Sequence, residues 1–231
     1  MSGDFRGQIT LDGPSGTGKT SVARDVARKL GAAYLDTGAM YRAATVAVLD
    51  AGVSLDDKVA VARAVSEAAI EVGTSAHREK VTVDGVDVRE RIRGAEVTRA
   101  VSPVSAVPAV RRLLVARQRE LVAAADVVVV EGRDIGTVVL PDATLKIYLT
   151  ASPEVRAQRR AGQLGVTAPE KIAALAQDLH RRDEHDSRRA DSPLRPADDA
   201  IVVDSTHLDK AGVVARILEL AGSAVGAGEL A

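Results

Sequence analysis

The chain has 231 residues, and its 31 lysines and arginines nearly balance its 32 aspartates and glutamates, for a formal net charge of -1. This excludes the global basic surface of nucleic-acid-binding proteins, and the absence of cysteine excludes disulfides, thiolate zinc sites and a cysteine nucleophile. Without a leader, a membrane-spanning run or aromatic stacking platforms, we expect a cytoplasmic monomer that contacts neither membranes nor nucleic acids.

The first elements are a strand, a glycine-rich loop and a helix. Residues 8–12 form a short β-branched run, and within residues 19–30 apolar side chains recur at every fourth position, as on one face of a helix. Residues 33–35 predict a second strand. Asp36 or Thr37 is placed to cap the helix that follows it.

The middle of the chain departs from this rhythm. Residues 57–70 predict an alanine-rich helix, whereas residues 80–88 alternate around an Asp-Gly pair, the strongest hairpin signal in the chain. We therefore assign residues 60–105 to an inserted subdomain. The remaining segments, residues 1–59 and 106–222, form the predicted core.

The second half returns to alternating helices and strands. A helix starting at Pro108 precedes strands at residues 127–130, 144–149 and 200–204, and a last helix at residues 209–220. Such alternation predicts an α/β fold, a doubly wound parallel five-stranded sheet with ligands at the carboxyl ends of its strands. Two arginine-rich helices flank a predicted lid near residues 156–170, and residues 223–231 predict a flexible tail.

The glycine-rich loop has the pattern of a phosphate-binding loop. Backbone N–H groups can converge on a triphosphate only where glycines allow unusual dihedral angles, and the following helix N-terminus then faces the anion. In this pattern Lys19 reaches the β- and γ-phosphates and the Thr20 hydroxyl coordinates Mg²⁺. The expected ATP-contacting residues are Gly13, Pro14, Ser15, Gly16, Thr17, Gly18, Lys19, Thr20 and Ser21.

Arginines indicate what receives the phosphoryl group. The base-recognition segment Asn-Lys-x-Asp of guanine-binding switch proteins is absent, whereas Arg42 and Arg133 each follow a predicted strand. Because guanidinium groups bind phosphate bidentately, two of them suit an acceptor that is itself a phosphate.

The two late helices carry further arginines at helical spacing. In the first, Arg156, Arg159 and Arg160 share one face, as expected of a lid over a transferring phosphoryl group. In the second, Arg182, Asp186 and Arg189 fall at spacings of four and three, which selects Arg189 over Arg188. A solvated, ion-paired face is the alternative for both groups, and we expect it for Arg181 and Arg188.

Several segments resemble the bacterial cytidylate kinases, a branch of the nucleoside monophosphate kinases. The principal ones are Ile9-Thr10-Leu11-Asp12-Gly13-Pro14-Ser15-Gly16-Thr17-Gly18-Lys19, Leu35-Asp36-Thr37-Gly38-Ala39-Met40-Tyr41-Arg42 and Glu131-Gly132-Arg133-Asp134-Ile135-Gly136-Thr137-Val138-Val139. The resemblance continues through Pro141-Asp142-Ala143 and Arg182-Asp183-Glu184 to Asp204-Ser205-Thr206. It covers nearly the whole chain and includes an inserted hairpin subdomain.

The resemblance implies a role for each matching position. The residues matched to the cytosine are Ser102, Arg111 and Asp134, and those matched to the ribose are Arg182 and Asp186. The clamp on the acceptor phosphate is Arg42, Arg133 and Arg189, with Asp36 and Tyr41 in the same CMP-binding set. The catalytic residues implied are Lys19, Arg133, Arg156, Arg159 and Arg160. A serine before Pro103 is otherwise typical of a turn or cap, and Asp36 either holds Mg²⁺ through water or caps its helix.

The resemblance implies transfer of the γ-phosphoryl group of Mg-ATP to the 5′-phosphate of CMP or dCMP. One alternative is a related small-molecule kinase acting on shikimate or another nucleotide. Another is an ATP-regulated interaction module with little turnover.

Overall fold

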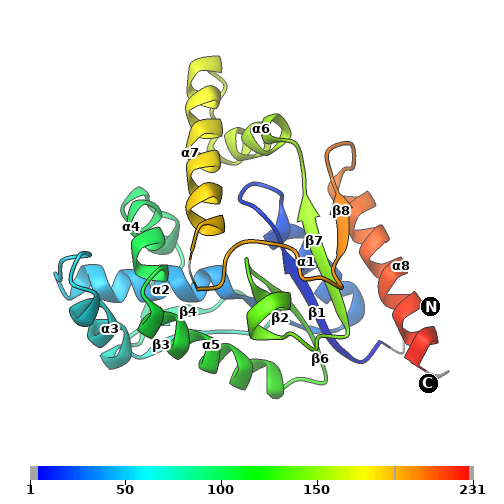
Figure 1. Ribbon diagram of the computed structural model, residues 1–231, viewed down its shortest axis with the longest axis horizontal. Helices are drawn as coiled ribbons and strands as arrows, with labels where there is room; N and C mark the ends of the chain where they lie inside the picture. The colour runs from blue at the N-terminus through cyan, green and yellow to red at the C-terminus, as the bar shows by residue number, and fades with distance from the viewer. Residues whose placement is uncertain (1–4, 190, 229–231) are drawn as a thin grey trace. The chain divides into compact units, whose positions relative to one another are not determined.

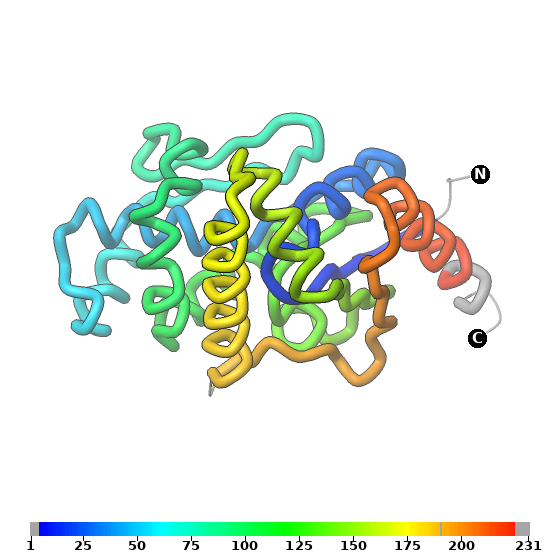
Figure 2. The backbone as a smooth tube through the Cα atoms, turned by 90° about the horizontal axis from the view of Figure 1, so that it is seen from above, coloured from blue at the N-terminus to red at the C-terminus, as the bar shows by residue number. Residues whose placement is uncertain are grey.

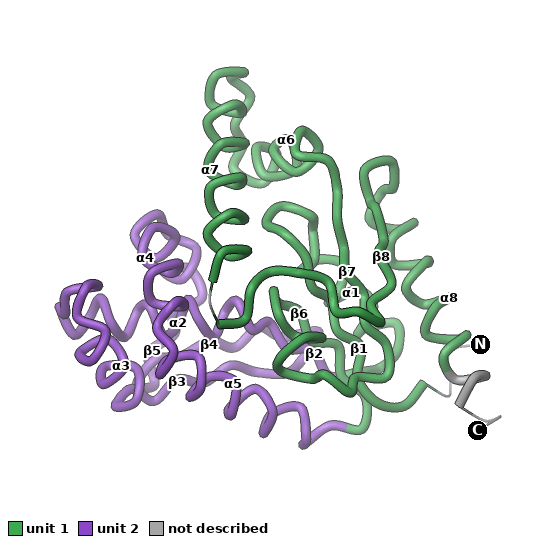
Figure 3. Tube along the Cα trace, viewed as in Figure 1, with its two compact units in different colours: residues 1–32, 126–231 green, residues 33–125 purple. Residues whose placement is uncertain are grey.

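The computed structural model describes residues 5–189 and 191–228. It divides into two compact units, one of Met1–Ala32 with Asp126–Ala231 and one of Ala33–Ala125 (Figure 3). The predicted insertion at residues 60–105 lies inside the second unit. This unit extends beyond the insertion at both ends.

A five-stranded sheet confirms the predicted fold class, and four of its strands belong to unit 1 (Figure 1). In sheet order they are β6 (Val127–Glu131), β1 (Gly7–Asp12), β7 (Leu145–Thr150) and β8 (Ile201–Asp204), each parallel to its neighbour. The fifth strand is β2 (Ala33–Asp36). In the central strand β1, residues 9–12 are buried, as the short β-branched run predicts.

The helices of unit 1 cover this sheet and extend beyond it. They are α1 (Lys19–Leu30), α6 (Pro153–Leu164), α7 (Pro169–Ser187) and α8 (Lys210–Gly228), with a π-helical segment η2 (Ile135–Val139). Helices α1 and α8 contact each other, as do α6 and α7, which lie side by side in both views (Figures 1 and 2). Ser152 caps α6 as predicted, its Oγ accepting from the Val155 N–H at 3.3 Å.

Unit 2 combines helices with a small antiparallel sheet. Its helices are α2 (Thr37–Asp50), α3 (Lys58–Glu67), α4 (Ala95–Ser105) and α5 (Pro108–Ala123), with a 3₁₀ segment η1 (Arg91–Arg93). The strands β3 (Ile70–Val72), β4 (Val81–Val83) and β5 (Val86–Asp87) pair in that order. The hairpin is confirmed, since Asp84 and Gly85 both have positive φ, as its tight turn requires. Its buried apolar side chains pack on Ala43 and Val46 of α2.

Two local expectations are wrong, and one alternative is not observed. The helix predicted over residues 57–70 ends at Glu67, because Ile70 pairs with Val83 of β4. The turn or cap that was the alternative for Ser102 is not observed, since Ser102 and Pro103 lie inside α4, which packs on α2. The last helix continues past residue 220 to Gly228, although residues 221–228 hold as many glycines as alanines and their composition does not favour helix; residues 229–231 of the predicted tail lie outside the described residues. In the described part of the chain, no helix combines the length and apolarity needed to cross a membrane.

Candidate active site

The phosphate loop joins β1 to α1 with the backbone geometry that the glycine pattern predicts. Gly13, Gly16 and Gly18 all have positive φ, and Gly18 stands at the N-terminus of α1 in the left-handed conformation. At Gly13 a Cβ atom would lie only 2.0 Å from the carbonyl oxygen of Leu149 on β7. The loop can therefore pass β7 only with glycine at this position.

Lys19 is buried at the start of α1 and directs its ammonium group into the loop. Its Nζ donates to the carbonyl oxygens of Gly13 at 2.7 Å and Pro14 at 2.6 Å, and to Thr17 Oγ1 at 3.3 Å. Burial lowers the pKa of Lys19 well below its ordinary value, and the positive charge of Arg133 lowers it further. The three acceptors match the three N–H bonds of an ammonium group, which places a positive charge within the loop.

Thr20 and Glu131 provide oxygen atoms beside the loop. Thr20 Oγ1 donates to Glu131 Oε2 at 3.0 Å, and Glu131 is the last, buried residue of β6. Hydroxyl and carboxylate oxygens are the donors that Mg²⁺ prefers, and in phosphate sites one or two carboxylates with substrate oxygens suffice. Among the described residues, no three acidic, histidine or cysteine side chains are grouped so that they could hold a metal ion by themselves. The pair thus fits a Mg²⁺ ion that is held jointly with a nucleotide.

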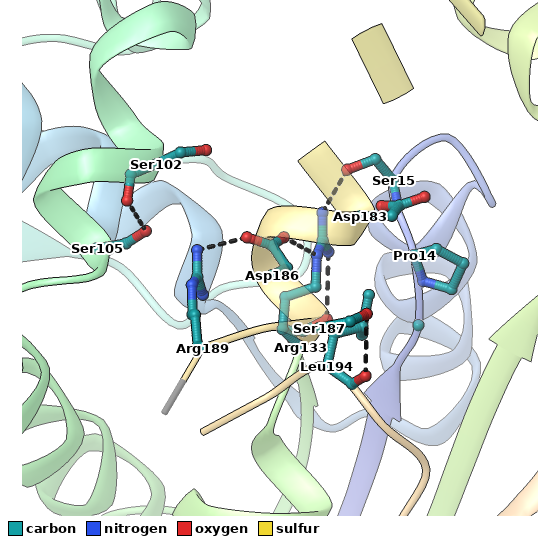
Figure 4. Close-up of polar contacts among 12 residues, drawn as sticks. Pro14, Ser15, Ser102, Ser105, Arg133, Asp183, Asp186, Ser187, Arg189 and Leu194 are labelled. Atoms are coloured by element: carbon teal, nitrogen blue, oxygen red, sulfur yellow. Dashed lines mark hydrogen bonds and ion pairs between the residues drawn. The ribbon is translucent and has the colours of Figure 1, made fainter. Parts of the chain in front are cut away.

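An ion-pair cluster lies against the loop; it consists of Arg133, Arg156, Asp183, Asp186 and Arg189. Figure 4 shows its members Arg133, Asp183, Asp186 and Arg189. The first half of the cluster centres on Asp183 of α7. Asp183 Oδ1 accepts from the Ser15 N–H at 2.9 Å, and Oδ2 accepts from Arg156 of α6. Arg156 also donates to the Ser15 carbonyl at 3.1 Å, so both helices are attached to one loop residue.

The second half of the cluster centres on Asp186. Its Oδ2 accepts from Arg133 Nε at 3.1 Å, and its Oδ1 accepts from Arg189. Arg133 Nη2 also donates to Ser15 Oγ at 2.7 Å, which connects the two halves of the cluster. Three guanidinium groups with two carboxylates leave an excess of positive charge beside the loop, the balance that an incoming phosphate requires.

The other arginines of the two late helices differ in their surroundings. Arg159 supports the loop, donating to Thr17 O at 3.2 Å and to Ser205 O at 2.7 Å. Arg160 does not join the cluster and donates to Gln163 on its own helix at 3.2 Å. Arg182 is half-buried on α7. Arg181 and Arg188 form exposed ion pairs with Asp178 and Glu184, which confirms the solvated face expected for both.

The predicted residues of unit 2 form two small groups. Asp36 caps α2, its Oδ1 accepting from the Ala39 N–H at 2.8 Å, and Oδ2 pairs with Arg42 at 3.3 Å. The cap alternative is therefore observed, while a metal role for Asp36 stays a prediction.

The second group surrounds Arg111. This buried guanidinium lies over the Tyr41 ring at 5.4 Å and donates to the Ser105 carbonyl at 3.4 Å. Ser105 Oγ in turn donates to the Ser102 carbonyl at 3.0 Å. Arg111 is therefore oriented on two sides by its own unit.

Sequence reasoning overlooked Asp12, Glu131 and Asp183 as site residues. Each lies inside a segment that carries the family resemblance, but an acidic residue at a strand end or on a helix has no distinctive spacing. Tyr148 of β7 was overlooked as well; burial raises its pKa, and the charge of Asp183 raises it further. The position of Asp12, directly before the phosphate loop, was the one available signal.

Comparisons with known proteins identify the family of this chain. A family model described as cytidylate kinase matches residues 9–223. A cytidylate kinase of Rhodococcus opacus (strain B4) is 56% identical over 96% of this chain and 97% of the relative. One of Nocardia farcinica (strain IFM 10152) is 53% identical over 99% of both. The crystal structure of a gluconokinase from Sinorhizobium meliloti 1021 aligns with a TM-score of 0.52 at 17% identity over 98% of this chain and 97% of that one, a likeness of fold alone.

Proposed function

Because the chain belongs to the cytidylate kinase family, we propose that it transfers the γ-phosphoryl group of Mg-ATP to the 5′-phosphate of CMP or dCMP. The observation that carries this proposal is the 2.7 Å hydrogen bond from Arg133 to Ser15. It attaches the segment most characteristic of the family to the phosphate loop. We further propose that the enzyme is a cytoplasmic monomer whose partners are nucleotides.

The donor side of the proposed reaction uses residues of unit 1. The loop amides and Lys19 bind the triphosphate, and Arg156 and Arg159 neutralise charge on the transferring group. Thr20 and Glu131 would hold Mg²⁺, which supplies positive charge to the β- and γ-phosphate oxygens. Arg160, which turns to Gln163, has the weakest support among the proposed catalytic residues.

The residues of the acceptor side are assigned by the family pattern. Arg42, Arg133 and Arg189 bind the acceptor phosphate, Arg182 and Asp186 the ribose, and Ser102, Arg111 and Asp134 the cytosine. The cytosine ring presents an exocyclic amine that a carboxylate accepts from and a carbonyl that a guanidinium donates to. The buried carboxylate of Asp134 and the oriented guanidinium of Arg111 have this complementary chemistry.

The chemical step needs positioning more than proton transfer. A phosphate monoester has its second pKa near 6, so the acceptor is mostly a dianion at neutral pH and no catalytic base is needed. The protein's residues align donor and acceptor, neutralise the equatorial oxygens and exclude water.

The direct test is ADP production measured with CMP, dCMP, UMP, AMP, GMP and shikimate supplied separately. We expect rapid turnover with CMP or dCMP and little with the others. Turnover that prefers shikimate or a purine nucleotide would refute cytidylate specificity. ADP production that does not depend on any acceptor would refute the kinase proposal in favour of a hydrolase or an ATP-regulated module.

Replacing Asp134 tests the proposed contact with the base. We expect Asp134→Ala to raise the KM for CMP about 100-fold, because a charge-assisted hydrogen bond is lost, and to leave ATP binding nearly unchanged. Asp142→Ala, an exposed carboxylate in the following loop, is the control. Equal losses for both nucleotides would show that Asp134 does not contact the base.

A further inference from the structure

Asp12, the last residue of β1, holds the segment that follows β6. Its side chain is buried, with 5% of the residue exposed, and its two oxygens accept from consecutive backbone amides. Oδ1 accepts from the Ile135 N–H at 2.9 Å and Oδ2 from the Gly136 N–H at 2.7 Å. These are the first amides of η2, which have no acceptor within their own helix.

The same strand also holds the other end of this segment. The Gly132 N–H donates to the Leu11 carbonyl at 3.0 Å. Leu11 and Asp12 therefore bind the backbone directly before and directly after two residues, Arg133 and Asp134. These are the residues that the proposed function assigns to the acceptor phosphate and to the cytosine.

Gly136 provides independent support for this arrangement. A Cβ atom at this position would lie 3.1 Å from Thr10 Oγ1, 3.2 Å from Lys146 Cδ and 3.4 Å from Asp12 Oδ2. Its φ lies outside the left-handed region, so backbone conformation does not require glycine here. Close approach to Thr10 and Asp12 of β1 and to Lys146 of β7 explains the glycine instead.

The buried carboxylate costs folding free energy. Burial and, to a smaller extent, the negative charge of Asp134 raise the pKa of Asp12 to about 6, even though both amides and Lys19 act to lower it. The group is still ionised at neutral pH, so both oxygens accept hydrogen bonds. An asparagine would avoid the cost of burying a charge but offers a single acceptor oxygen, so it could not satisfy both amides.

We infer that Asp12 is a positioning residue for the acceptor, holding Arg133 and Asp134 in register through the amides of Ile135 and Gly136. The inference rests on the proposed function, since it takes from it the roles of Arg133 and Asp134. The inference predicts that loss of Asp12 weakens the binding of one nucleotide, the acceptor, more than that of the other. Both hydrogen bonds of the carboxylate go to the 135–136 backbone and neither goes to the phosphate loop, so loss of Asp12 disturbs the acceptor more than ATP.

Asp12→Asn tests the carboxylate. We expect the KM for CMP to rise about tenfold, the dissociation constant of ATP measured without acceptor to change less than about twofold, and amide hydrogen exchange at residues 135 and 136 to accelerate. The control is Asp57→Asn, an exposed carboxylate that also accepts from two consecutive amides, at 3.1 and 2.9 Å. We expect it to leave both nucleotide constants unchanged.

Gly136→Ala tests the same contact by changing η2 instead of Asp12. It replaces the first test if the Asp12 variant does not fold. The added methyl group pushes η2 away from Asp12 and Thr10, and we expect the same selective rise in the KM for CMP. Gly222→Ala is its control, because a Cβ atom there meets nothing within 4 Å.

The outcomes separate the inference from the function on which it rests. A wild-type enzyme without CMP-dependent ADP production would refute the proposed function. If the wild type is active, an unchanged KM for CMP in both variants despite accelerated exchange at residues 135 and 136 would overturn the positioning role. Equal losses for CMP and ATP would overturn it too, since they indicate general damage to the site. A selective loss for CMP in either variant supports the inference.

Discussion

The phosphate loop and the ion-pair cluster beside it both gather positive charge, but they are built differently. The loop uses consecutive backbone groups, glycines with positive φ and one buried ammonium group. The cluster uses side chains from three segments of unit 1: the residues just after β6, helix α6, and α7 with the residues just beyond it. One region is a continuous stretch of chain, whereas the other exists only after folding.

The difference in construction predicts a difference in tolerance. A change in the loop alters backbone that has no alternative conformation, so its effect is large and local. In the cluster each arginine pairs with an aspartate, and Arg133 and Arg189 share Asp186, so removing a carboxylate leaves a guanidinium group without its ion pair and the effect depends on burial. The following variants, from the largest expected effect to the smallest, test this contrast.

Replacing Lys19 removes the only charge of the loop itself. We expect Lys19→Ala to lower kcat about 1,000-fold or more, because the transferring phosphoryl group loses a buried cation. Coupled ADP detection with CMP measures the effect. Lys210→Ala, which removes an exposed lysine paired with Asp25, should keep wild-type activity. Undiminished turnover in the Lys19 variant would end the phosphate-loop interpretation.

Alanine variants of two glycines with positive φ separate the effect of steric crowding on stability from the effect of backbone strain alone. Gly13→Ala places a Cβ atom 2.0 Å from the Leu149 carbonyl, and we expect it to lower the free energy of unfolding by about 4 kcal/mol or more. Gly31→Ala, where a Cβ atom meets nothing within 4 Å, should cost only about 1 kcal/mol. Denaturant unfolding measures both. Similar losses in the two variants would contradict the close approach of the loop to β7.

Variants of two aspartates of α7 show how much a buried ion pair and an exposed one each contribute to stability. Asp183→Asn leaves Arg156, whose side chain is 10% exposed, without its carboxylate, and should cost about 3 kcal/mol. Asp178→Asn breaks a pair with Arg181 whose side chains are 62% and 77% exposed, and should cost less than about 1 kcal/mol. Thermal unfolding at low and high salt measures the difference. Equal costs would show that burial does not set the strength of the cluster.

The pH dependence of stability reports the buried charge of Asp12. Its pKa is raised from 3.8 to about 6, so its contribution to stability is fully present below pH 3.8 and is lost as the pH rises through 6. Asp12→Asn removes this titration. The stability of the variant relative to the wild type should therefore increase by about 2 kcal/mol between pH 4 and pH 7. Thermal unfolding across this range measures it, and a difference that does not vary with pH would contradict the raised pKa.

Local pattern was sufficient for the features made of neighbouring residues. The phosphate loop, the Asp-Gly hairpin, the caps at Asp36 and Ser152 and the alternation of strands and helices were all predicted correctly. In each of them the hydrogen bonds or dihedral angles involve residues a few positions apart. Propensity failed where strand pairing decided the outcome, as at β3.

Tertiary structure alone decided which charges meet. The bond from Ser15 to Asp183 joins residues 168 positions apart, and those from Thr20 to Glu131 and from Ile135 to Asp12 span 111 and 123 positions. It also gave Arg160 a partner on its own helix, Gln163, instead of a place in the cluster. An acidic side chain has the same local pattern whether it faces water or an arginine. Its partner depends on which strand ends and helices the fold brings together.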